Sequence, residues 1–428
     1  MNTKKKFRDM THEERLHHLK TEKNLQDKEI DYFRNTGALE FDILNGMVEN
    51  AIGIFPIPIG IANNFVINNK EYLVPMATEE PSVIAAASNA AKIAKTSGGF
   101  VASVDESIMI GQIQLIPEDL HNTPNIHSAM KLIEDSRNKI IDLANTKSKF
   151  AKCIDVKTKY VNDDSINRLG QMIIVEIFVD TKDAMGANVV NTMCEAIAPK
   201  IETITGGKVI LKILSNYATS RLARCKGTFP KDAIGGEEIV KRILFSYAMA
   251  YSDTYRAVTH NKGIMNGVDS VAIAAGQDFR AIEAGCHAYA CRDGQYRSLT
   301  KWYPDSNGDL VGEIEIPIAV GTVGGIINTH PIVKTCLKIM DITNSKELAM
   351  LIAASGLAQN FSAIRALSNE GIQKGHMKLH SKNIAIMAGA TGEKIEQIST
   401  MMIKEGNVSV SRAKEILETM NQNKKIEQ

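Results

Sequence analysis

Hydrophobic and polar residues follow two different periods along this chain, and the change of period predicts a mixed α/β fold. Amphipathic helices are expected over 126–145 and 188–205, where apolar residues recur every three to four positions. Strands are expected over 108–117, 171–179 and 208–215, which are short runs rich in Ile and Val. This alternation of strands and helices indicates a compact unit of roughly a hundred residues, placed between two parts of a larger domain.

Capping and turn signals place the elements on either side of this unit. The segment Thr11-His-Glu-Glu14 is a capping box that predicts an N-terminal helix, and helical pattern continues over 40–53. A hairpin is expected to turn at 68–70. An alanine-rich helix should begin at Pro81, which places Glu80 beside its N-cap. Other predicted helices cover 238–251, 281–290 (just after Asp278), 346–365 and two segments after 389, and 311–320 is predicted to be a strand.

A candidate for chemistry lies in the stretch that begins at His260. Lys262 stands between Asn261 and Gly263, so we expect it in a tight turn that leads into a buried apolar segment. A lysine held in this way can stabilise negative charge on an oxygen atom in a transition state. A solvated loop lysine is the alternative interpretation, and the neighbouring amides and the later carboxylate of Asp278 argue against it.

Composition restricts the class of protein. The 428 residues are too many for one small core, so two or three domains are expected. A net charge of +1 argues against a nucleic-acid partner or an anionic membrane surface. The chain lacks the run of about 18 apolar residues that a membrane span requires. Its six cysteines form no Cys-x-x-Cys pair, which is typical of reduced thiols in a cytoplasmic protein.

Two further motifs are candidates for ligand binding. Asp183-Ala-Met-Gly-Ala-Asn188 lies where a predicted strand meets a helix, and Gly186 would let a phosphate approach the helix N-terminus. An ordinary turn is the alternative, because Gly-x-Gly-x-x-Gly is absent. His376 and His380 are one helical turn apart, but no His-Glu-x-x-His motif or cysteine pair accompanies them. We therefore expect no metal site.

Taken in order, several motifs closely resemble those of the hydroxymethylglutaryl-CoA reductases, specifically the soluble second class of bacteria and archaea. They are Glu49-Asn-Ala-Ile-Gly53, Glu79-Glu-Pro-Ser-Val83, Asp183-Ala-Met-Gly-Ala-Asn188, His260-Asn-Lys-Gly-Ile-Met-Asn-Gly267, Asp278, Gly321-Thr-Val-Gly-Gly325 and Gly375-His-Met377. The resemblance covers nearly the whole chain, and the ordered set is far more specific than any one motif.

The resemblance implies a large α/β substrate domain, an inserted ferredoxin-like nucleotide-binding domain that is not a Rossmann fold, and a mobile helical C-terminal flap. The corresponding boundaries are 1–106 and 218–374 for the large domain, 107–217 for the inserted domain and 375–428 for the flap. It also implies a homodimer, joined in part through Glu49–Gly53, with the active site between subunits and its glutamate and lysine on different chains. A larger assembly of dimers is left open.

The implied reaction reduces 3-hydroxy-3-methylglutaryl-CoA to mevalonate and CoA with two hydrides from a nicotinamide cofactor. Lys262 matches the lysine that stabilises charge on the carbonyl oxygen, and Glu80 matches the glutamate that supplies a proton to the aldehyde. Asp278 matches the aspartate that links these two groups, and His376 matches the histidine that protonates the CoA thiolate.

The resemblance also assigns binding residues. Arg256 is matched to the carboxylate of the hydroxymethylglutaryl group. The other expected substrate residues are Ser82, Asn266, Gln359, Asn360 and His380. The expected cofactor residues are Ser148, Lys149, Asp183, Met185, Gly186, Asn188 and Gly321.

The segment Ser148-Lys-Phe-Ala151 departs from the NADH-using relative that defines this class, which has an aspartate there. A hydroxyl and a cation suit a 2′-phosphate, so NADPH is the predicted cofactor and NADH the alternative. Two rival functions remain open: the same enzyme running in reverse to oxidise mevalonate, and a non-enzymatic CoA- or nucleotide-binding protein. The second would be expected to lack at least one of Glu80, Lys262, Asp278 and His376, and all four are present.

Overall fold

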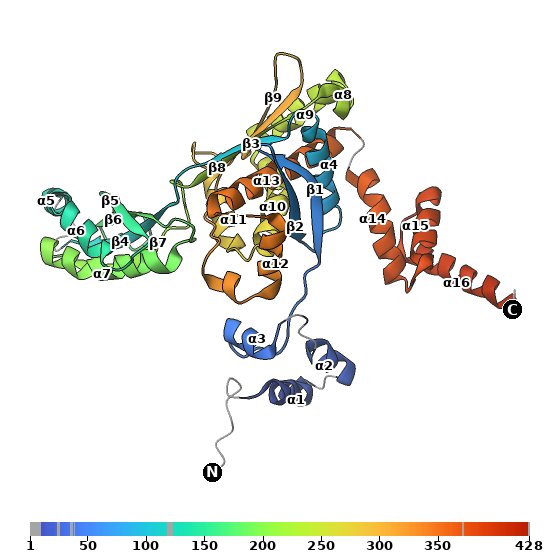
Figure 1. Ribbon diagram of the computed structural model, residues 1–428, viewed down its shortest axis with the longest axis horizontal. Coiled ribbons are helices and arrows are strands. Elements are labelled where there is room, and N and C mark those ends of the chain that lie inside the picture. Colours follow the sequence, from blue (N-terminus) through green and yellow to red (C-terminus); the bar gives the residue numbers. More distant parts are fainter. Residues whose placement is uncertain are drawn as a thin grey trace, which may run out of the picture.

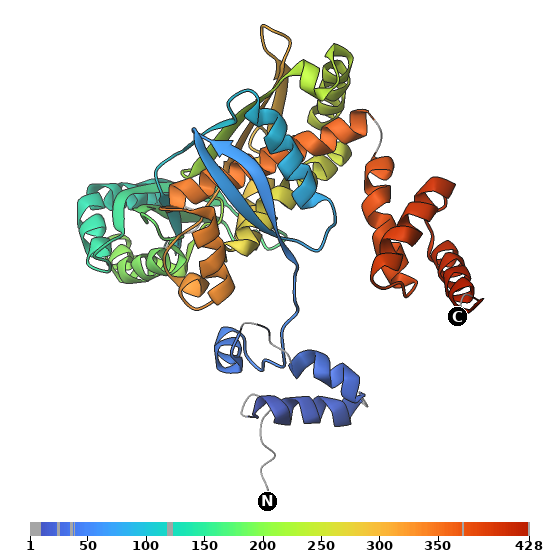
Figure 2. The same ribbon diagram turned by 45° about the vertical axis from the view of Figure 1, so that its right-hand side comes forward.

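The computed structural model describes residues 10–23, 26–34, 37, 39–117, 123–369 and 372–426. A central sheet and a second sheet form the body, and a group of helices extends from it at each end of the chain (Figures 1 and 2). These outer helices are α1 (His12–Lys23), α2 (Asp27–Arg34) and α3 (Phe41–Met47), then α14 (Ile372–Met387), α15 (Glu393–Glu405) and α16 (Val410–Ile426). The expected mixed α/β class is confirmed.

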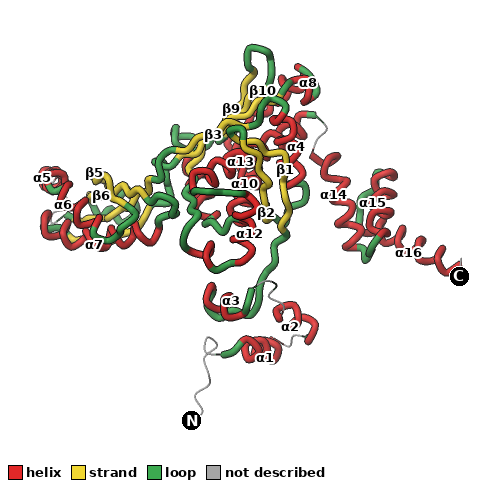
Figure 3. The backbone as a smooth tube through the Cα atoms, in the orientation of Figure 1, coloured by secondary structure: helices red, strands yellow, loops and turns green. Residues whose placement is uncertain are grey.

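The central sheet has six strands in the order β2-β1-β3-β8-β10-β9. Their bounds are β1 Ile59–Ile67, β2 Lys70–Ala77, β3 Phe100–Val104, β8 Leu222–Phe229, β9 Thr300–Pro304 and β10 Leu310–Pro317. Strands β1 and β2 pair antiparallel, with Ile67 opposite Lys70, so the predicted hairpin is confirmed. The chain leaves this sheet after β3 and returns to it at β8, so the second sheet is built from the residues between them (Figure 3).

Helices cover the central sheet and form the main core with it. These are α4 (Val83–Lys95), α8 (Lys231–Ile234), α9 (Glu237–Ser252), α10 (Thr254–Ala274), α11 (Phe279–Tyr289), α12 (Pro331–Met340) and α13 (Ser345–Ser368). Helix α13 packs against α10 and α4 and against β3, β8 and β10. Among the described helices, α13 alone is long and apolar enough to cross a membrane, and 83% of that stretch is buried within the protein. Such burial is typical of a core helix.

The second sheet is antiparallel, with the order β5-β6-β4-β7. Its strands are β4 Ile108–Ile116, β5 Lys152–Asn162, β6 Gln171–Asp180 and β7 Lys208–Leu214, and its helices are α5 Thr123–Asp135, α6 Arg137–Asn145 and α7 Ala187–Thr205. A separate hydrophobic core joins the sheet to these helices. Because the order of elements is βα, ββ, αβ with one helix split in two, this unit has ferredoxin-like connectivity.

Two details of this unit differ from the sequence-based expectation. The helix predicted over 126–145 is divided at Ser136, whose backbone has left the helical region (φ −95°, ψ 4°). Strand β5 was not predicted, because much of it is polar and only Cys153 and Val156 are buried along it. An edge strand with one partner can form with so few buried side chains.

Lys262 lies within helix α10, so the predicted turn around it is wrong. Gly267, the last glycine of this stretch, serves helix packing instead of a turn. A Cβ on Gly267 would lie 2.5 Å from the carbonyl oxygen of Ser355 and 2.9 Å from Cβ of Gln359 on α13. Helix α10 begins at the N-cap Asp253, whose side chain accepts a hydrogen bond from the Arg256 amide.

Other helix ends also differ from the predictions. Helix α4 begins at Val83 after the N-cap Ser82, so Pro81 lies outside the helix and Glu80 lies in the preceding loop. The helical pattern predicted over 40–53 gives a helix that ends at Met47. Strand β10 ends at Pro317, three residues before the predicted end. The predicted capping box is confirmed by reciprocal hydrogen bonds between Thr11 and Glu14.

The C-terminal helices pack mainly on one another. Ile384, Ile398, Met402 and Ile416 belong to a small core formed by α14, α15 and α16. The two predicted final helices are confirmed, and Gly406 ends the first of them in the left-handed conformation. The link predicted over 371–375 falls largely within α14, and residues 370 and 371 are outside the described part of the chain.

Glu347 joins the β1–β2 hairpin to the start of α13. Its carboxylate accepts hydrogen bonds from Lys70 Nζ at 2.6 Å and from the Tyr72 hydroxyl at 2.7 Å. It also accepts from the amide and the hydroxyl of Thr343, at 2.7 and 2.8 Å. Although burial opposes ionisation, these donors together lower the pKa of Glu347 to about 2.

We predict that Glu347→Gln lowers the free energy of unfolding by about 2 kcal/mol at neutral pH, because a buried set of donors loses its anion. Since the pKa falls from 4.5 to about 2, this contribution is complete above pH 4.5 and is lost as the pH falls toward 2. Urea unfolding followed by fluorescence of Trp302, which lies in the same core as Tyr72, measures it.

The matched control is Glu71→Gln, which removes an exposed ion pair with Lys95 and should change stability by less than about 0.5 kcal/mol. Equal stability of the wild type and Glu347→Gln at pH 7 would contradict the assignment. So would a difference that persists unchanged at pH 3.

Candidate active site

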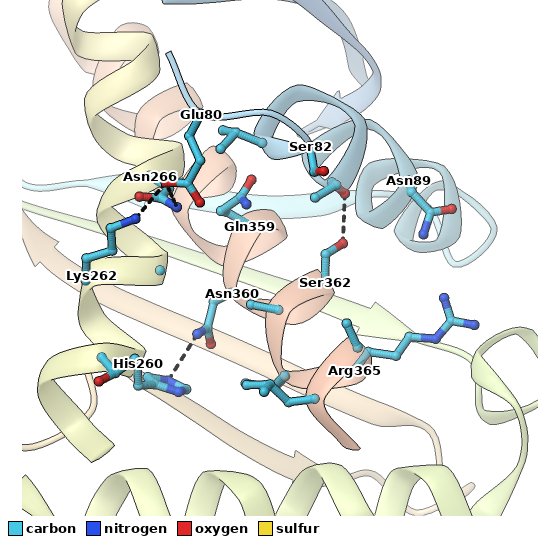
Figure 4. Close-up of a pocket in the computed structure, with 18 of the residues that line it drawn as sticks. Glu80, Ser82, Asn89, His260, Lys262, Asn266, Gln359, Asn360, Ser362 and Arg365 are labelled. Carbon is cyan, nitrogen blue, oxygen red and sulfur yellow. Dashed lines mark hydrogen bonds and ion pairs between the residues drawn. The ribbon is translucent and has the colours of Figure 1, made fainter. Parts of the chain in front are cut away.

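A cavity of about 550 Å³ opens between the start of α4, α10 and α13 (Figure 4). It is lined by most of the residues predicted to bind substrate, and by two of the predicted catalytic residues. These are Glu80, Ser82, Arg256, Lys262, Asn266, Gln359 and Asn360. The cavity therefore brings together motifs that are far apart in the sequence.

Glu80 and Lys262 form the charged centre of the cavity. Nζ of Lys262 donates to Oε2 of Glu80 at 2.7 Å, and Nδ2 of Asn266 donates to the same oxygen at 3.3 Å. Lys262 and Asn266 are one turn apart on α10, so their side chains leave the same face. The side chains of the ion pair are 60% and 37% exposed, so the pair adds little stability and is accessible to a ligand. Because both residues belong to one chain, the expectation that they come from different subunits is wrong.

Two polar atoms at the cavity lack partners among the described residues. The hydroxyl of Ser82 and Oε1 of Gln359 are buried and make no hydrogen bond. Ser82 also has a φ of 77°, in the left-handed region that a residue with a Cβ seldom adopts. Unpaired buried polar groups together with backbone strain are typical of a ligand-binding site.

Arg256 supplies a second positive charge to the lining. Its guanidinium makes no hydrogen bond or ion pair with any described residue, although its backbone amide donates to Asp253 at 2.7 Å. Burial lowers the pKa of Arg256. A guanidinium that is half-buried in a cavity and unpaired within the chain is suited to a ligand carboxylate, which it can bind through two hydrogen bonds.

A buried network with one unsatisfied donor forms the lower wall of the cavity. The indole N–H of Trp302 donates to Oδ1 of Asn360 at 2.9 Å, which fixes the orientation of that amide. Nδ2 of Asn360 therefore donates to Nε2 of His260, at 3.1 Å. Burial lowers the pKa of His260 to about 3, so the ring is neutral and carries its proton on Nδ1, which has no partner. Both the oxygen and the nitrogen of the Asn360 side chain are thus hydrogen-bonded within the protein.

The C-terminal segment carries two of the predicted site residues, His376 and His380. His380 is exposed on α14 and does not line the cavity, and the side chain of His376 is outside the described part of the chain. Over the described residues, no group of three or more His, Cys, Asp or Glu side chains is arranged to hold a metal ion.

The predicted cofactor loop, Asp183–Asn188, leads from β6 into α7. Gly186 is the N-cap of α7 with a φ of 103°, and a Cβ there would lie 2.4 Å from Cγ2 of Thr181. Helix α7 begins without a side-chain cap and without an acidic residue in its first turn. Its first amide groups are therefore available, and the N-terminus of a 19-residue helix favours a phosphate.

Gly321 packs directly on this loop. A Cβ on Gly321 would lie 2.6 Å from the amide nitrogen of Met185, and the next amide, Thr322, donates to the Asp183 carbonyl at 2.8 Å. The side-chain amide of Gln277 binds both backbone groups of Gly321, at 2.8 and 3.0 Å. The structure thus brings together two segments that were predicted to bind cofactor.

Ser148 and Lys149 lie at the same end of the second sheet as this loop. They precede Lys152, the first residue of β5, which pairs with Asp180 at the end of β6. Lys149 is exposed. The two loops that were predicted to contact the cofactor are therefore next to adjacent strand ends: one precedes β5 and the other follows β6.

Asp278 is not part of the cavity. It is the N-cap of α11, where its side chain accepts from the Ala281 amide at 3.1 Å, and it is exposed. Helix α10 alone carries the chain roughly 18 Å from Lys262 to Ala274, at about 1.5 Å per residue. The predicted link of Asp278 to Glu80 and Lys262 is therefore not made within one chain.

Sequence reasoning missed Arg221 and Gln277, which hold the cofactor loop and Gly321 in place. Gln277 could have been noticed, because it directly precedes Asp278. Arg221 carries no local signal, since an arginine at the start of a strand usually faces solvent.

Known proteins match this chain along most of its length. The family model described as hydroxymethylglutaryl-coenzyme A reductase matches residues 11–381. The chain is 49% identical over 419 residues to 3-hydroxy-3-methylglutaryl-coenzyme A reductase of Archaeoglobus fulgidus, covering 97% of this chain and 94% of that protein. It is 36% identical over 394 residues to the probable enzyme of Borreliella burgdorferi, covering 90% and 87%.

The fold is also similar to that of solved structures. The class II 3-hydroxy-3-methylglutaryl-CoA reductase from Streptococcus pneumoniae, bound to NADPH in open conformations, superposes with a TM-score of 0.74 at 36% identity. The match covers 96% of this chain and 100% of that one. Since sequence and fold agree over nearly the whole length, this chain belongs to the hydroxymethylglutaryl-coenzyme A reductase family.

Proposed function

We propose that this protein reduces 3-hydroxy-3-methylglutaryl-CoA to mevalonate and CoA with two equivalents of NADPH, as a step of isoprenoid biosynthesis. The observation that carries this proposal is the Glu80–Lys262 pair in a cavity that also presents an unpaired arginine. An acyl group with a carboxylate at one end and a thioester at the other needs both features.

In this proposal Lys262 stabilises negative charge on the reacting oxygen, and Glu80 supplies its proton. The nicotinamide, when bound, supplies a hydride in each of the two reduction steps. Hydride addition to a carbonyl carbon places negative charge on its oxygen, and the ammonium of Lys262 stabilises that charge. Because Nζ and Oε2 are 2.7 Å apart, a proton can pass between the two groups, and Glu80 delivers it to the oxygen of the aldehyde in the second step.

The other lining residues hold the acyl group. Arg256 binds its carboxylate, and Ser82 and Gln359 gain the hydrogen bonds that they lack within the chain. Between the two reductions the carbon–sulfur bond breaks and the CoA thiolate leaves. By its resemblance to the family motif, His376 protonates that thiolate, and α14–α16 form the flap that carries it over the substrate.

The unit from 107 to 217 binds the dinucleotide in this proposal. The fit rests on the uncapped start of α7 and on Gly186, whose lack of a side chain lets a diphosphate approach the backbone. Asp183 orders the loop by accepting from the Ser345 amide at 2.9 Å.

A second copy of the chain completes the site. Within one chain, Glu80 and Lys262 meet near the middle of α10, and Asp278 lies beyond its C-terminal end, next to Gln277, which binds Gly321 beside the cofactor loop. A homodimer that sets the Glu80–Lys262 cavity of one chain against the Asp278 segment of the other would bring Asp278 and the cofactor to this pair. Large apolar side chains exposed on α9 and α10 support such a contact: Phe245 (68%), Met249 (57%), Tyr255 (89%) and Val258 (50%).

We predict that the purified protein oxidises two NADPH for each hydroxymethylglutaryl-CoA consumed, and that Lys262→Ala lowers kcat by about 10²–10³-fold because the oxyanion loses its cation. Absorbance at 340 nm measures the rate. The same variant should unfold at nearly the wild-type temperature, since the ion pair is exposed. Wild-type protein without turnover on either cofactor would leave only a binding function.

We also predict that Ser148→Asp shifts the ratio of kcat/KM values from NADPH toward NADH. The hydroxyl of Ser148 accepts from the amides of Phe150 and Ala151, at 3.2 and 3.0 Å. An aspartate can accept the same hydrogen bonds, so the loop should keep its shape while its new charge repels a 2′-phosphate.

Ser148→Asn is the matched control, because it keeps the turn without the charge. An unchanged ratio in Ser148→Asp would refute the placement of the 2′-phosphate. A wild-type protein that prefers NADH would favour mevalonate oxidation as the physiological direction.

A further inference from the structure

Arg221 is a charged side chain in the protein interior, only 1% exposed, and it lies directly before β8. Nη1 donates to the carbonyl oxygens of Ala184 and Met185, at 3.2 and 3.4 Å, and to the Thr181 hydroxyl at 3.3 Å. Nη2 donates to the carbonyl oxygen of Val320. One guanidinium therefore joins the loop before α7 to the segment that leads to Gly321.

The positive charge of Arg221 is not neutralised by a direct partner. No carboxylate of a described residue lies within ion-pair distance, and Nε makes no hydrogen bond. Asp183 and Asp180 act on it only through longer-range attraction, and burial lowers the pKa of Arg221 to about 10. The group is thus still charged at neutral pH, and a buried charge without a counter-ion is unfavourable unless an anion comes near it.

The contacts of Arg221 also orient the amides of the cofactor loop. In a trans peptide the N–H points away from the preceding carbonyl. Because the carbonyls of Ala184 and Met185 face the guanidinium, the amides of Met185 and Gly186 face away from it. Neither amide donates to a described residue. Successive free amides at a helix start form a concave site for an anion.

We propose that Arg221 is a positioning residue for the dinucleotide. It clamps the carbonyls of the 183–188 loop so that the amides of this loop are presented to the diphosphate, and it supports the bound diphosphate with its own charge. This inference rests on the proposed use of a nicotinamide dinucleotide by the same site.

If Arg221 has this role, its loss should reduce the affinity for the cofactor alone, and it should do so equally for NADH and NADPH. NADH and NADPH share the diphosphate and differ at the 2′-position. Loss of Arg221 should weaken both by the same factor, in contrast to Ser148→Asp, which should separate them. The Glu80–Lys262 cavity has no contact with Arg221, so binding of hydroxymethylglutaryl-CoA should be unaffected.

The test measures the Kd of NADPH and of NADH by nicotinamide fluorescence, and the Kd of hydroxymethylglutaryl-CoA, for the wild type, Arg221→Met and Arg221→Lys. Arg221→Met should weaken both dinucleotides by roughly tenfold or more. Arg221→Lys should fall between it and the wild type, because lysine keeps the charge but cannot hold several carbonyls in one planar fork.

Arg224→Met is the matched control. Arg224 lies three residues further along β8, is 41% exposed, and pairs with Asp105 and Glu315 on the surface. Its substitution should leave the affinity for both dinucleotides unchanged.

Wild-type dinucleotide affinity in Arg221→Met would overturn the inference, and so would an equal loss of affinity for hydroxymethylglutaryl-CoA, which would indicate general damage to the fold. If Arg221→Met does not fold, Arg221→Lys becomes the deciding variant. Wild-type affinity of Arg221→Lys for the dinucleotides would then overturn the proposed positioning role. A wild-type protein that binds no dinucleotide would instead refute the proposed function itself.

Discussion

The length of α10 is the constraint on which the organisation of this site depends. The helix carries Lys262 and Asn266 on one face, toward Glu80, and it packs closely on α13, where Gly267 meets the backbone of Ser355. It then runs on for about two turns, from Asn266 to Ala274, before the chain reaches Asp278. A rigid helix of this length keeps two groups of functional residues apart in one chain, so the shared chemistry proposed for them requires a second copy.

The region around Asp278 is organised by one short segment, which contains Gly321. Gln277 binds both backbone groups of Gly321, and the cofactor loop lies against the face of Gly321 that lacks a side chain. Arg221 fixes the same loop from behind. A displacement of this segment would therefore move Asp278 and the cofactor loop together. Such a frame would keep Asp278 and the loop before α7 in fixed relation to each other.

The sequence predicted correctly which residues line the cavity, but it predicted their secondary structure less well. Motif resemblance placed Glu80, Lys262, Asn266 and Gln359 at one site, and the fold brings these four together. The glycines and asparagines around Lys262 predicted a turn, which is wrong because Gly263 and Gly267 both lie inside helix α10. Motif resemblance also placed Glu80 and Lys262 on different chains, since motif order carries no information about which ends of the fold meet.

Other features were outside the reach of local patterns. The polar edge strand β5 lacks the alternation that marks a half-buried strand. Arg221 became visible only through tertiary contacts with two segments, one about forty residues before it and the other about a hundred after it. Burial and unpaired atoms, which identified Ser82 and Arg221 as unusual, are properties of the fold and have no counterpart in the sequence.

The most direct test of this account is complementation between two inactive variants. Lys262→Ala and Asp278→Asn would be produced together with different tags, and the mixed dimer isolated through both. If each site takes Lys262 from one chain and Asp278 from the other, the mixed dimer has one intact site and about half of the wild-type activity. A mixed dimer of Glu80→Gln with Lys262→Ala should remain inactive, because those residues share a chain. An inactive Lys262→Ala/Asp278→Asn dimer, or an active Glu80→Gln/Lys262→Ala dimer, would contradict the account.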